Sequence, residues 1–217
     1  MPLCFDLDGT IGSFGGGYVL LRQALGDLWG EEPTASDLKA CAGSTDWEIV
    51  EELHRKRFGR ALPIDVYERY DHACLLRFQG IFHPEGRSPE VFQGLISGMT
   101  SLVEAGHKVW LVSGNAPSVL DFKAHALNVD PRIPRLGSLP QHDRAGLIRK
   151  ALRGCPGPHL YVGDRPHDRD AARAAGVPFL GVGEAVPGEH PILSIQAEAE
   201  HLVLAVKAIL QDSGTAG

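Results

Sequence analysis

A short apolar run at the start of the chain ends in two carboxylates, Asp6 and Asp8, one residue apart. Strand periodicity places both on the same side, and Gly9 lets the chain turn sharply after them. An apolar strand that ends in acids is typical of a site at the crevice of an α/β sheet, although Asp-Gly is also a common surface turn. The site is favoured by a second acidic cluster, in which Asp164 and Asp168 follow another apolar run.

The composition is that of a globular protein long enough to bury a sizeable core. The 217 residues include 21 Lys or Arg and 27 Asp or Glu, so the net charge is −6, which excludes the basic surface that general nucleic-acid binding needs. No stretch approaches the ~20 apolar residues of a membrane span, and a strand pattern so near Met1 leaves no room for a signal peptide. We therefore expect a cytoplasmic protein that binds neither nucleic acid nor membranes.

The cysteines are widely spread and lack the paired spacing of metal or redox motifs. We expect all of them to be free thiols, which fits a reducing compartment. Cys4 is expected to be buried in the first strand. The four residues are Cys4, Cys41, Cys74 and Cys155.

Apolar residues recur at helical intervals between residues 14 and 87, with no convincing strand among them. Thr34 and Thr45 can cap two of the helices. The glycine-rich residues 12–17 are predicted to be a flexible hinge, and residues 80–90 to be a loop that leads out of the helical segment. The helices are expected at 18–28, 35–42, from 45 onward and at 64–78.

From residue 90 onward strand and helix patterns alternate, which is typical of a parallel sheet with helices on both faces. Strands are expected at 108–112, 159–163 and 178–182, with a short apolar segment near Leu136. Helices are expected at 90–105, 117–127, 143–153, 167–175 and 196–211, followed by a frayed tail over 212–217. The sequence thus predicts an α/β core of residues 1–13 and 88–217, with an all-helical insertion over 14–87.

Three of the predicted strands end in polar side chains of different kinds. Asp6 and Asp8 follow the first, Ser113 and Asn115 follow the strand at 108–112, and an acidic cluster follows the strand at 159–163. Because the carboxyl ends of parallel strands meet at one edge, we expect these side chains to converge. Carboxylate oxygens with no His or Cys among them are the ligands that Mg²⁺ prefers. The Ser113 hydroxyl, the Asn115 amide and the backbone N–H groups of a strand-to-helix turn are suited to binding phosphoryl oxygens.

The segments Asp6-Leu7-Asp8-Gly9-Thr10, Ser113-Gly114-Asn115 and Gly163-Asp164 through Asp168 resemble motifs one, two and four of the haloacid dehalogenase-like hydrolases. The resemblance covers nearly the whole predicted core and implies a Rossmann-like fold. The helical insertion after the first motif resembles the first cap position of the family's phosphoglycolate phosphatase-like branch.

The resemblance implies a role for each matching acid. Asp6 would attack phosphorus and form an aspartyl-phosphate. Asp8 would protonate the leaving alcohol and then activate water, while its backbone carbonyl binds the metal. Asp164 would bind Mg²⁺ beside Asp6, and Asp168 would support the ion directly or through water. Ser113 would be a further catalytic residue, and Gly9, Thr10, Gly114 and Asn115 would bind the substrate.

The third motif of the family is a cation that holds the nucleophile and the phosphate. Arg144 stands at the expected place before the fourth motif, and Lys123 is its rival on the helix after the second motif. Arg would bind phosphate as a bidentate fork and Lys as a point charge. We expect one of the two to take this role and the other to be an ordinary surface charge.

The resemblance implies a Mg²⁺-dependent phosphatase, monomeric or homodimeric, that hydrolyses a small phosphorylated metabolite. A phosphomutase of the same family, a phosphonate hydrolase using a cap lysine such as Lys39 or Lys56, and a non-catalytic binding protein are the alternatives. The metal-free dehalogenase branch lacks the second acid, so Asp8 argues against it. Cap cations that an anionic substrate could reach are Arg22, Lys39, Arg55, Lys56 and Arg57, although such charges are mostly surface groups.

Overall fold

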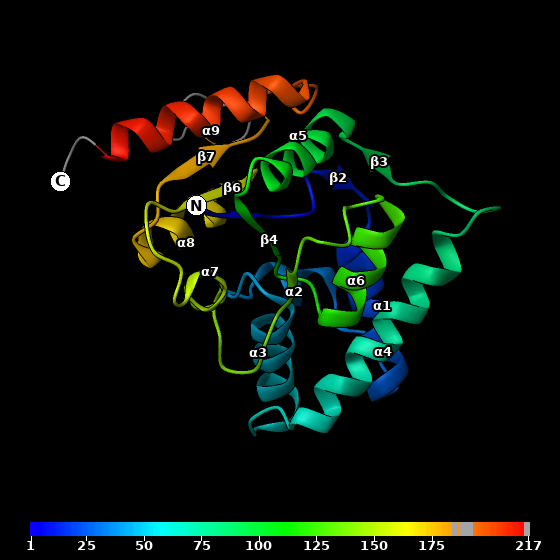
Figure 1. Cartoon of the computed structure of the whole chain (residues 1–217). Helices are drawn as coiled ribbons and strands as arrows, with labels where there is room; N and C mark the ends of the chain where they lie inside the picture. Colours follow the sequence, from blue (N-terminus) through cyan, green and yellow to red (C-terminus); the bar gives the residue numbers. More distant parts are fainter. Residues whose placement is uncertain (184–185, 187–192, 215–217) are drawn as a thin grey trace.

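A sheet of five parallel strands organises the chain, in the order β5-β4-β1-β6-β7 (Figure 1). The computed structural model describes residues 1–183, 186 and 193–214. The strands are β1 (Pro2–Phe5), β4 (Lys108–Val112), β5 (Arg135–Leu136), β6 (Leu160–Gly163) and β7 (Phe179–Gly181). The predicted α/β class is confirmed, and the segment near Leu136 is β5, one of the two edge strands.

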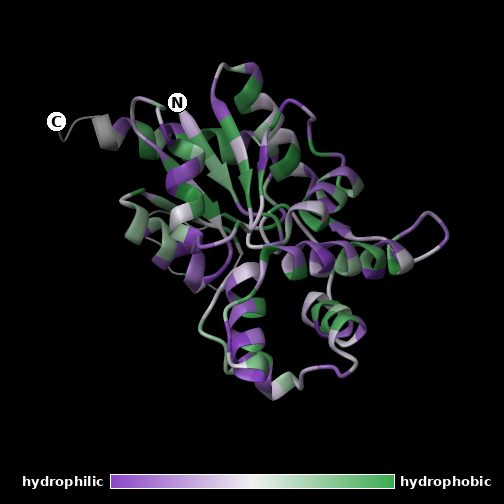
Figure 2. Cartoon of the chain, turned by 90° about the horizontal axis from the view of Figure 1, so that it is seen from below, coloured by the Kyte–Doolittle hydropathy of each residue, from purple (hydrophilic) through white to green (hydrophobic). Residues whose placement is uncertain are grey.

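Helices cover both faces of the sheet, as predicted. On one face, α5 (Gln93–Glu104) packs against α9 (Ala199–Gly214). On the other, α7 (Arg144–Leu152) packs against α8 (Pro166–Ala175). The apolar strands are thereby enclosed between two layers of helices (Figure 2), and each layer has its own buried apolar cluster.

Residues 14–89 contain helices and no strand. The helices are α1 (Gly17–Trp29), α2 (Ala35–Lys39), α3 (Asp46–Phe58) and α4 (Ile64–Ile81). Thr34 and Thr45 form capping boxes at the starts of α2 and α3, because each hydroxyl accepts a hydrogen bond from the backbone three residues later. Helix α1 packs against α4, and α4 packs against α6 (Pro117–Ala126), which follows β4.

Two predictions at the borders of this helical segment are wrong. Residues 12–13 were expected to be hinge and residues 90–91 the start of a helix, but β2 (Gly12–Ser13) and β3 (Glu90–Val91) pair as an antiparallel ribbon. The backbone N–H of Phe92 extends the ribbon by donating to the Ile11 carbonyl at 3.1 Å. Such a short pairing depends on contacts between segments some 80 residues apart, so local periodicity does not reveal it.

Several helix ends also differ from the predicted ones. Helix α2 stops at Lys39, α4 continues to Ile81, and α9 runs through Gly214 rather than ending before a frayed tail at 212. The rest of that expected tail, 215–217, lies outside the described residues. Within the described part of the chain, no helix combines the length and apolar character that crossing a bilayer requires.

Candidate active site

The central strand β1 places the first acid between two neighbours. Phe5, the last residue of β1, pairs with Leu111 of β4 on one side and Val162 of β6 on the other. Asp6 follows directly, and its backbone N–H donates to the Val162 carbonyl at 2.9 Å. The ends of β1, β4 and β6 therefore lie side by side, and this brings the polar side chains that follow them to one edge of the sheet.

Asp6, Asp164 and Asp168 gather at this edge, each with a carboxylate oxygen within 4.8 Å of the others. Their exposed fractions are only 5%, 8% and 0%. Burial, followed by the neighbouring carboxylate of Asp168, raises the pKa of Asp6 and raises that of Asp164 to about 6. Such a cluster of like charges needs positive charge for its ionised form to persist.

Arg144 supplies part of that charge from the first turn of α7. Its Nη1 lies 3.0 Å from Oδ1 of Asp6 and 2.9 Å from Oδ1 of Asp168, and it donates to the Tyr161 hydroxyl at 3.4 Å. Burial lowers the pKa of Arg144, but Asp168, Tyr161 and Asp6 more than offset this and leave the pKa above its ordinary value. The guanidinium Nε is buried without a hydrogen-bond partner.

The donor set fits a hard divalent cation. Three carboxylates offer oxygen atoms alone, and the single buried guanidinium among them leaves negative charge uncompensated. Asp168 is the most constrained of the three, because it is fully buried with Oδ1 held by Arg144 and Oδ2 by the backbone N–H of Arg165 at 3.0 Å. Asp164 is held instead by Thr10 and by the exposed side chain of Arg165. Asp6 and Asp164 are therefore the better candidates for direct ligands.

Asp8 lies outside this cluster and belongs to a separate hydrogen-bonded group. Its Oδ2 accepts from Lys123 Nζ at 2.6 Å and from Asn115 Nδ2 at 2.8 Å. Asn115 in turn accepts from Lys123 at 2.8 Å and donates to the Ser113 hydroxyl at 2.7 Å. With 38% of its side chain exposed, Asp8 is the most accessible of the motif acids, so the two acids of the first motif have different surroundings.

Lys123 and Arg144 both lie in the site, so the expectation that one is a surface charge is wrong. Lys123 is 2% exposed, with Nζ 4.6 Å from the ring centre of Phe78 and 5.4 Å from that of Phe14. These aromatic rings come from the helical segment and its entry, so they shield the ammonium group from water. Such burial depends on tertiary packing and could not be derived from residue type.

Gly9 and Thr10 lie against Asp164 rather than facing open space. Thr10 is fully buried, and its hydroxyl donates to Oδ1 of Asp164 at 3.3 Å. Gly9 has φ +87°, and a Cβ there would fall 2.2 Å from Oδ2 of Asp164, so only glycine fits. The predicted contact of these two residues with substrate is therefore better described as support for the Asp164 carboxylate.

The start of α3 rests on the second motif, a contact that the sequence analysis did not foresee. The backbone N–H of Asp46 donates to the Gly114 carbonyl at 2.7 Å, and Arg144 Nη2 donates to the Ser44 carbonyl at 2.8 Å. A Cβ on Gly114 would approach both that carbonyl and the guanidinium to 2.6 Å. Thr45 and Asp46 have the residue types of an ordinary helix start, so nothing local signals the contact.

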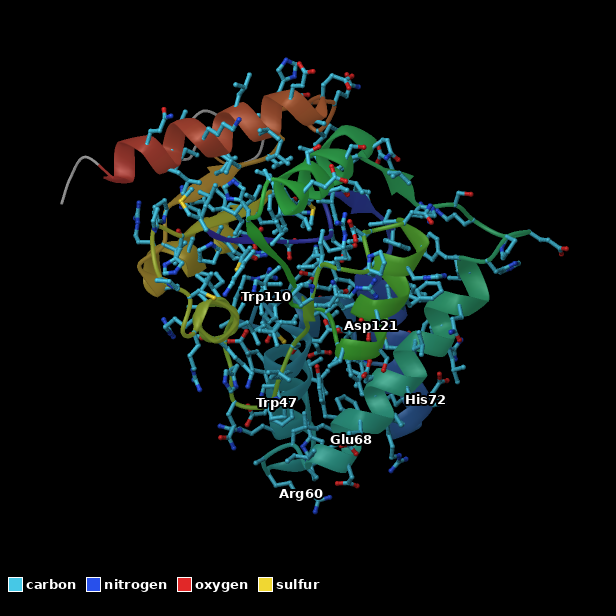
Figure 3. The ribbon with its side chains drawn as sticks, in the orientation of Figure 1. Trp47, Arg60, Glu68, His72, Trp110 and Asp121 are labelled. Atoms are coloured by element: carbon cyan, nitrogen blue, oxygen red, sulfur yellow. The ribbon has the colours of Figure 1, made fainter. Side chains whose placement is uncertain are left out.

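A groove of about 930 Å³ lies elsewhere, between α1 and α4. Glu68 and His72, which lie along α4 in Figure 3, line it together with Asp27 of α1. None of the candidate site residues borders this groove. Its volume therefore does not bear on the chemistry at the acid cluster.

The family is decided by a sequence comparison that spans most of the chain. A family model described as haloacid dehalogenase-like hydrolase matches residues 3–182, a range that contains every candidate site residue discussed above. The chain belongs to the haloacid dehalogenase-like hydrolases. No curated protein matches the sequence.

Solved structures share the fold of this haloacid dehalogenase-like hydrolase at low sequence identity. CbbY from Rhodobacter sphaeroides, in complex with phosphate, is 14% identical with a TM-score of 0.64, covering 90% of this chain and 94% of its own. β-Phosphoglucomutase from Clostridium difficile is also 14% identical with a TM-score of 0.64, at 96% and 97% coverage. A predicted phosphoglycolate phosphatase from Haemophilus somnus is 16% identical with a TM-score of 0.57, at 95% and 96% coverage.

Proposed function

We propose that the protein is a Mg²⁺-dependent phosphatase that hydrolyses a small organic phosphate monoester through an aspartyl-phosphate on Asp6. The observation that carries the proposal is the difference in surroundings between the two acids of the first motif, Asp6 and Asp8. Asp6 is buried among carboxylates beside Arg144, whereas Asp8 is accessible and held by Lys123. Placing a nucleophile and a proton donor in different surroundings is the arrangement that two-step phosphoryl transfer requires.

Asp6 attacks phosphorus with the oxygen that faces the substrate, while Arg144 holds its Oδ1 and keeps the carboxylate oriented. The unpartnered Nε of Arg144 leaves the guanidinium with a donor to spare. Asp6 and Asp164 would hold Mg²⁺, with Asp168 as a third or water-mediated ligand. When bound, the ion supplies positive charge that offsets the repulsion between the carboxylate and an anionic phosphate.

Asp8 donates a proton to the leaving alcohol oxygen and then takes one from the water that hydrolyses the aspartyl-phosphate. Lys123 and Asn115 fix its carboxylate through Oδ2, and this leaves Oδ1 for the proton transfer. Ser113 supports this role indirectly, because its hydroxyl accepts a hydrogen bond from Asn115, which in turn binds Asp8. Of the backbone N–H groups in the second motif, that of Gly114 is the candidate for binding phosphoryl oxygens, because those of Ser113 and Asn115 donate to the Leu136 carbonyl and to the Ser113 hydroxyl.

Residues 14–87 are proposed to act as the cap over this site. Support comes from the contacts of Ser44 and Asp46 with the second motif and with Arg144, which cover Asp6. The phosphonate-hydrolase alternative loses its basis, since that reaction needs a cap lysine of lowered pKa. Lys39 is exposed, and a hydrogen bond from Lys56 to Asp37 raises the pKa of Lys56 instead.

A turnover assay with 4-nitrophenyl phosphate, with and without Mg²⁺, tests the proposal. We expect release of inorganic phosphate only with the metal, and loss of turnover in Asp6→Asn by at least about a thousandfold. Rapid quenching should trap a phosphoryl group on the wild-type protein and not on Asp6→Asn. Metal-independent turnover, or an active Asp6→Asn protein, would refute the mechanism. A phosphomutase would instead transfer the phosphoryl group to a second hydroxyl without net phosphate release.

A further inference from the structure

Most cations of helices α1 and α3 are held by partners within the helical segment. Each Lys and Arg of these two helices is paired with a neighbouring acid or carbonyl of the same segment, and Lys39 of α2 is exposed. The four paired charges are thus compensated within the helical segment itself. The pairs are Arg22 with Glu32 and the Pro33 carbonyl, Arg55 with Glu51, Lys56 with Asp37, and Arg57 with Glu31.

The cations within the site are already matched by carboxylates of the core. Lys123 is bound to Asp8, and Arg144 lies between two acids of the cluster. Arg165, at the exposed rim, places Nε 2.9 Å from Oδ2 of Asp164. Among the described residues, the three cations that these contacts place in the site therefore each already face a carboxylate.

Asp46 is the charged side chain that the start of α3 brings to the site. Its Oδ2 is fixed by the Ala116 backbone N–H at 2.9 Å and the Tyr70 hydroxyl at 3.1 Å. Among the described residues, no hydrogen bond engages Oδ1 and no ion pair neutralises the carboxylate. Asp8 and Lys123 both lie near enough to act on it electrostatically.

In the proposed mechanism the leaving group lies beside Asp8, which protonates it. Asp46 approaches the same region, because Oδ2 of Asp46 accepts from the N–H of Ala116, and the preceding residue, Asn115, binds Asp8. A hydroxyl or ammonium group there can donate to the free Oδ1, whereas a carboxylate would meet like charge in a partly buried place. Building on the phosphatase function, we propose that Asp46 makes the enzyme select phosphate monoesters whose alcohol carries a hydroxyl or ammonium donor and reject those that carry a carboxylate.

Three esters on the same two-carbon frame isolate this choice: 2-hydroxyethyl phosphate, phosphoethanolamine and phosphoglycolate. We expect the wild-type protein to hydrolyse the first two with a kcat/KM at least about tenfold above that for phosphoglycolate, because like charges a few ångströms apart in a partly buried site repel strongly. 4-Nitrophenyl phosphate, which carries neither group, reports the phosphatase activity itself.

The Asp46→Asn variant keeps the acceptor for Ala116 and Tyr70 but removes the charge. We expect its preference over phosphoglycolate to shrink to within about threefold, by the same electrostatic argument. Asp46→Ser also removes the charge, and it should show the same loss of preference, which excludes a folding defect specific to the Asn variant. The matched control is Asp65→Asn, which removes an exposed carboxylate of α4 away from the site and should keep the wild-type preference.

The outcomes separate the selectivity from the phosphatase function. If 4-nitrophenyl phosphate is hydrolysed but phosphoglycolate is the best of the three esters, the selectivity is refuted and the phosphatase stands. If no ester is hydrolysed, the phosphatase function is refuted. The selectivity is then tested separately, by measuring the binding of the three esters to the Mg²⁺-loaded protein by calorimetry. Tightest binding of phosphoglycolate, or binding of none, would then overturn it.

Discussion

The Arg144 guanidinium lies 3.0 Å from the carboxylate of Asp6, and the same nitrogen reaches Asp168 at 2.9 Å. The other acid of the first motif has a cation of its own, since Lys123 is 2.6 Å from Asp8. A guanidinium can bridge two carboxylates at once, whereas an ammonium group acts as a point charge. Removal of Arg144 and removal of Lys123 are therefore expected to impair catalysis in different ways.

Arg144→Met is predicted to lower kcat/KM for every phosphate ester by about two to three orders of magnitude, because the nucleophile loses its orienting charge. Without metal, the variant should also be less stable by about 3–5 kcal/mol, since buried carboxylates are left unpaired. Steady-state kinetics and urea unfolding measure the two effects. Arg149→Met, an exposed position on the same helix, is the control, and near-normal activity of Arg144→Met would contradict the assignment.

Lys123→Met is predicted to act through the leaving group. Because Lys123 fixes the proton donor Asp8, turnover of 2-hydroxyethyl phosphate should fall by about 10²-fold or more, and that of 4-nitrophenyl phosphate, whose leaving group needs no proton, should fall less. The ratio of the two kcat values measures this. Lys150→Met on the surface of α7 should leave the ratio unchanged. Equal losses on both substrates would assign Lys123 to phosphate binding instead.

Asp46 is predicted to make stability depend on pH. Burial raises its pKa from 3.8 to about 6, against hydrogen bonds from Ala116 and Tyr70 and the charge of Lys123, which lower it. The folded protein thus holds a proton that the unfolded chain has lost, so its stability falls as the pH rises through about 6.

Urea unfolding of the wild type and Asp46→Asn between pH 4 and pH 7 tests this dependence. Asn does not titrate, so the wild type should lose about 1–3 kcal/mol relative to the variant over this range. The Asp65→Asn control should follow the wild type. Parallel curves for the wild type and Asp46→Asn would show that Asp46 keeps an ordinary pKa.

The cysteines are predicted to differ in reactivity. All four are free, and burial raises the pKa of Cys4 well above its ordinary value and that of Cys74 to about 12. Cys41 and Cys155 are partly exposed. Iodoacetamide at pH 8 should therefore label only the latter two in the native protein and all four in urea, as read by peptide mass spectrometry. Rapid native labelling of Cys4 would contradict its burial in β1.

The sequence by itself determined the fold class and the acid cluster. Alternation of strand and helix patterns requires a parallel sheet, and the carboxyl ends of its strands necessarily share one edge. Asp6, Ser113 and Asp164 each follow a strand directly, so their convergence follows from topology without knowledge of any side-chain contact. The capping boxes at Thr34 and Thr45 are equally local, because each involves residues only three positions apart.

Only the tertiary structure decided which groups act on the acids. The burial of both Lys123 and Arg144 depends on aromatic rings and carbonyls supplied by distant segments, and a charged residue on a helix has the same sequence pattern whether it is buried or exposed. Asp46 likewise looks like the first residue of a helix, and becomes part of the site because α3 is seated on Gly114. Periodicity reports which face of a helix is apolar, but what lies opposite that face is set by packing between segments far apart in the chain.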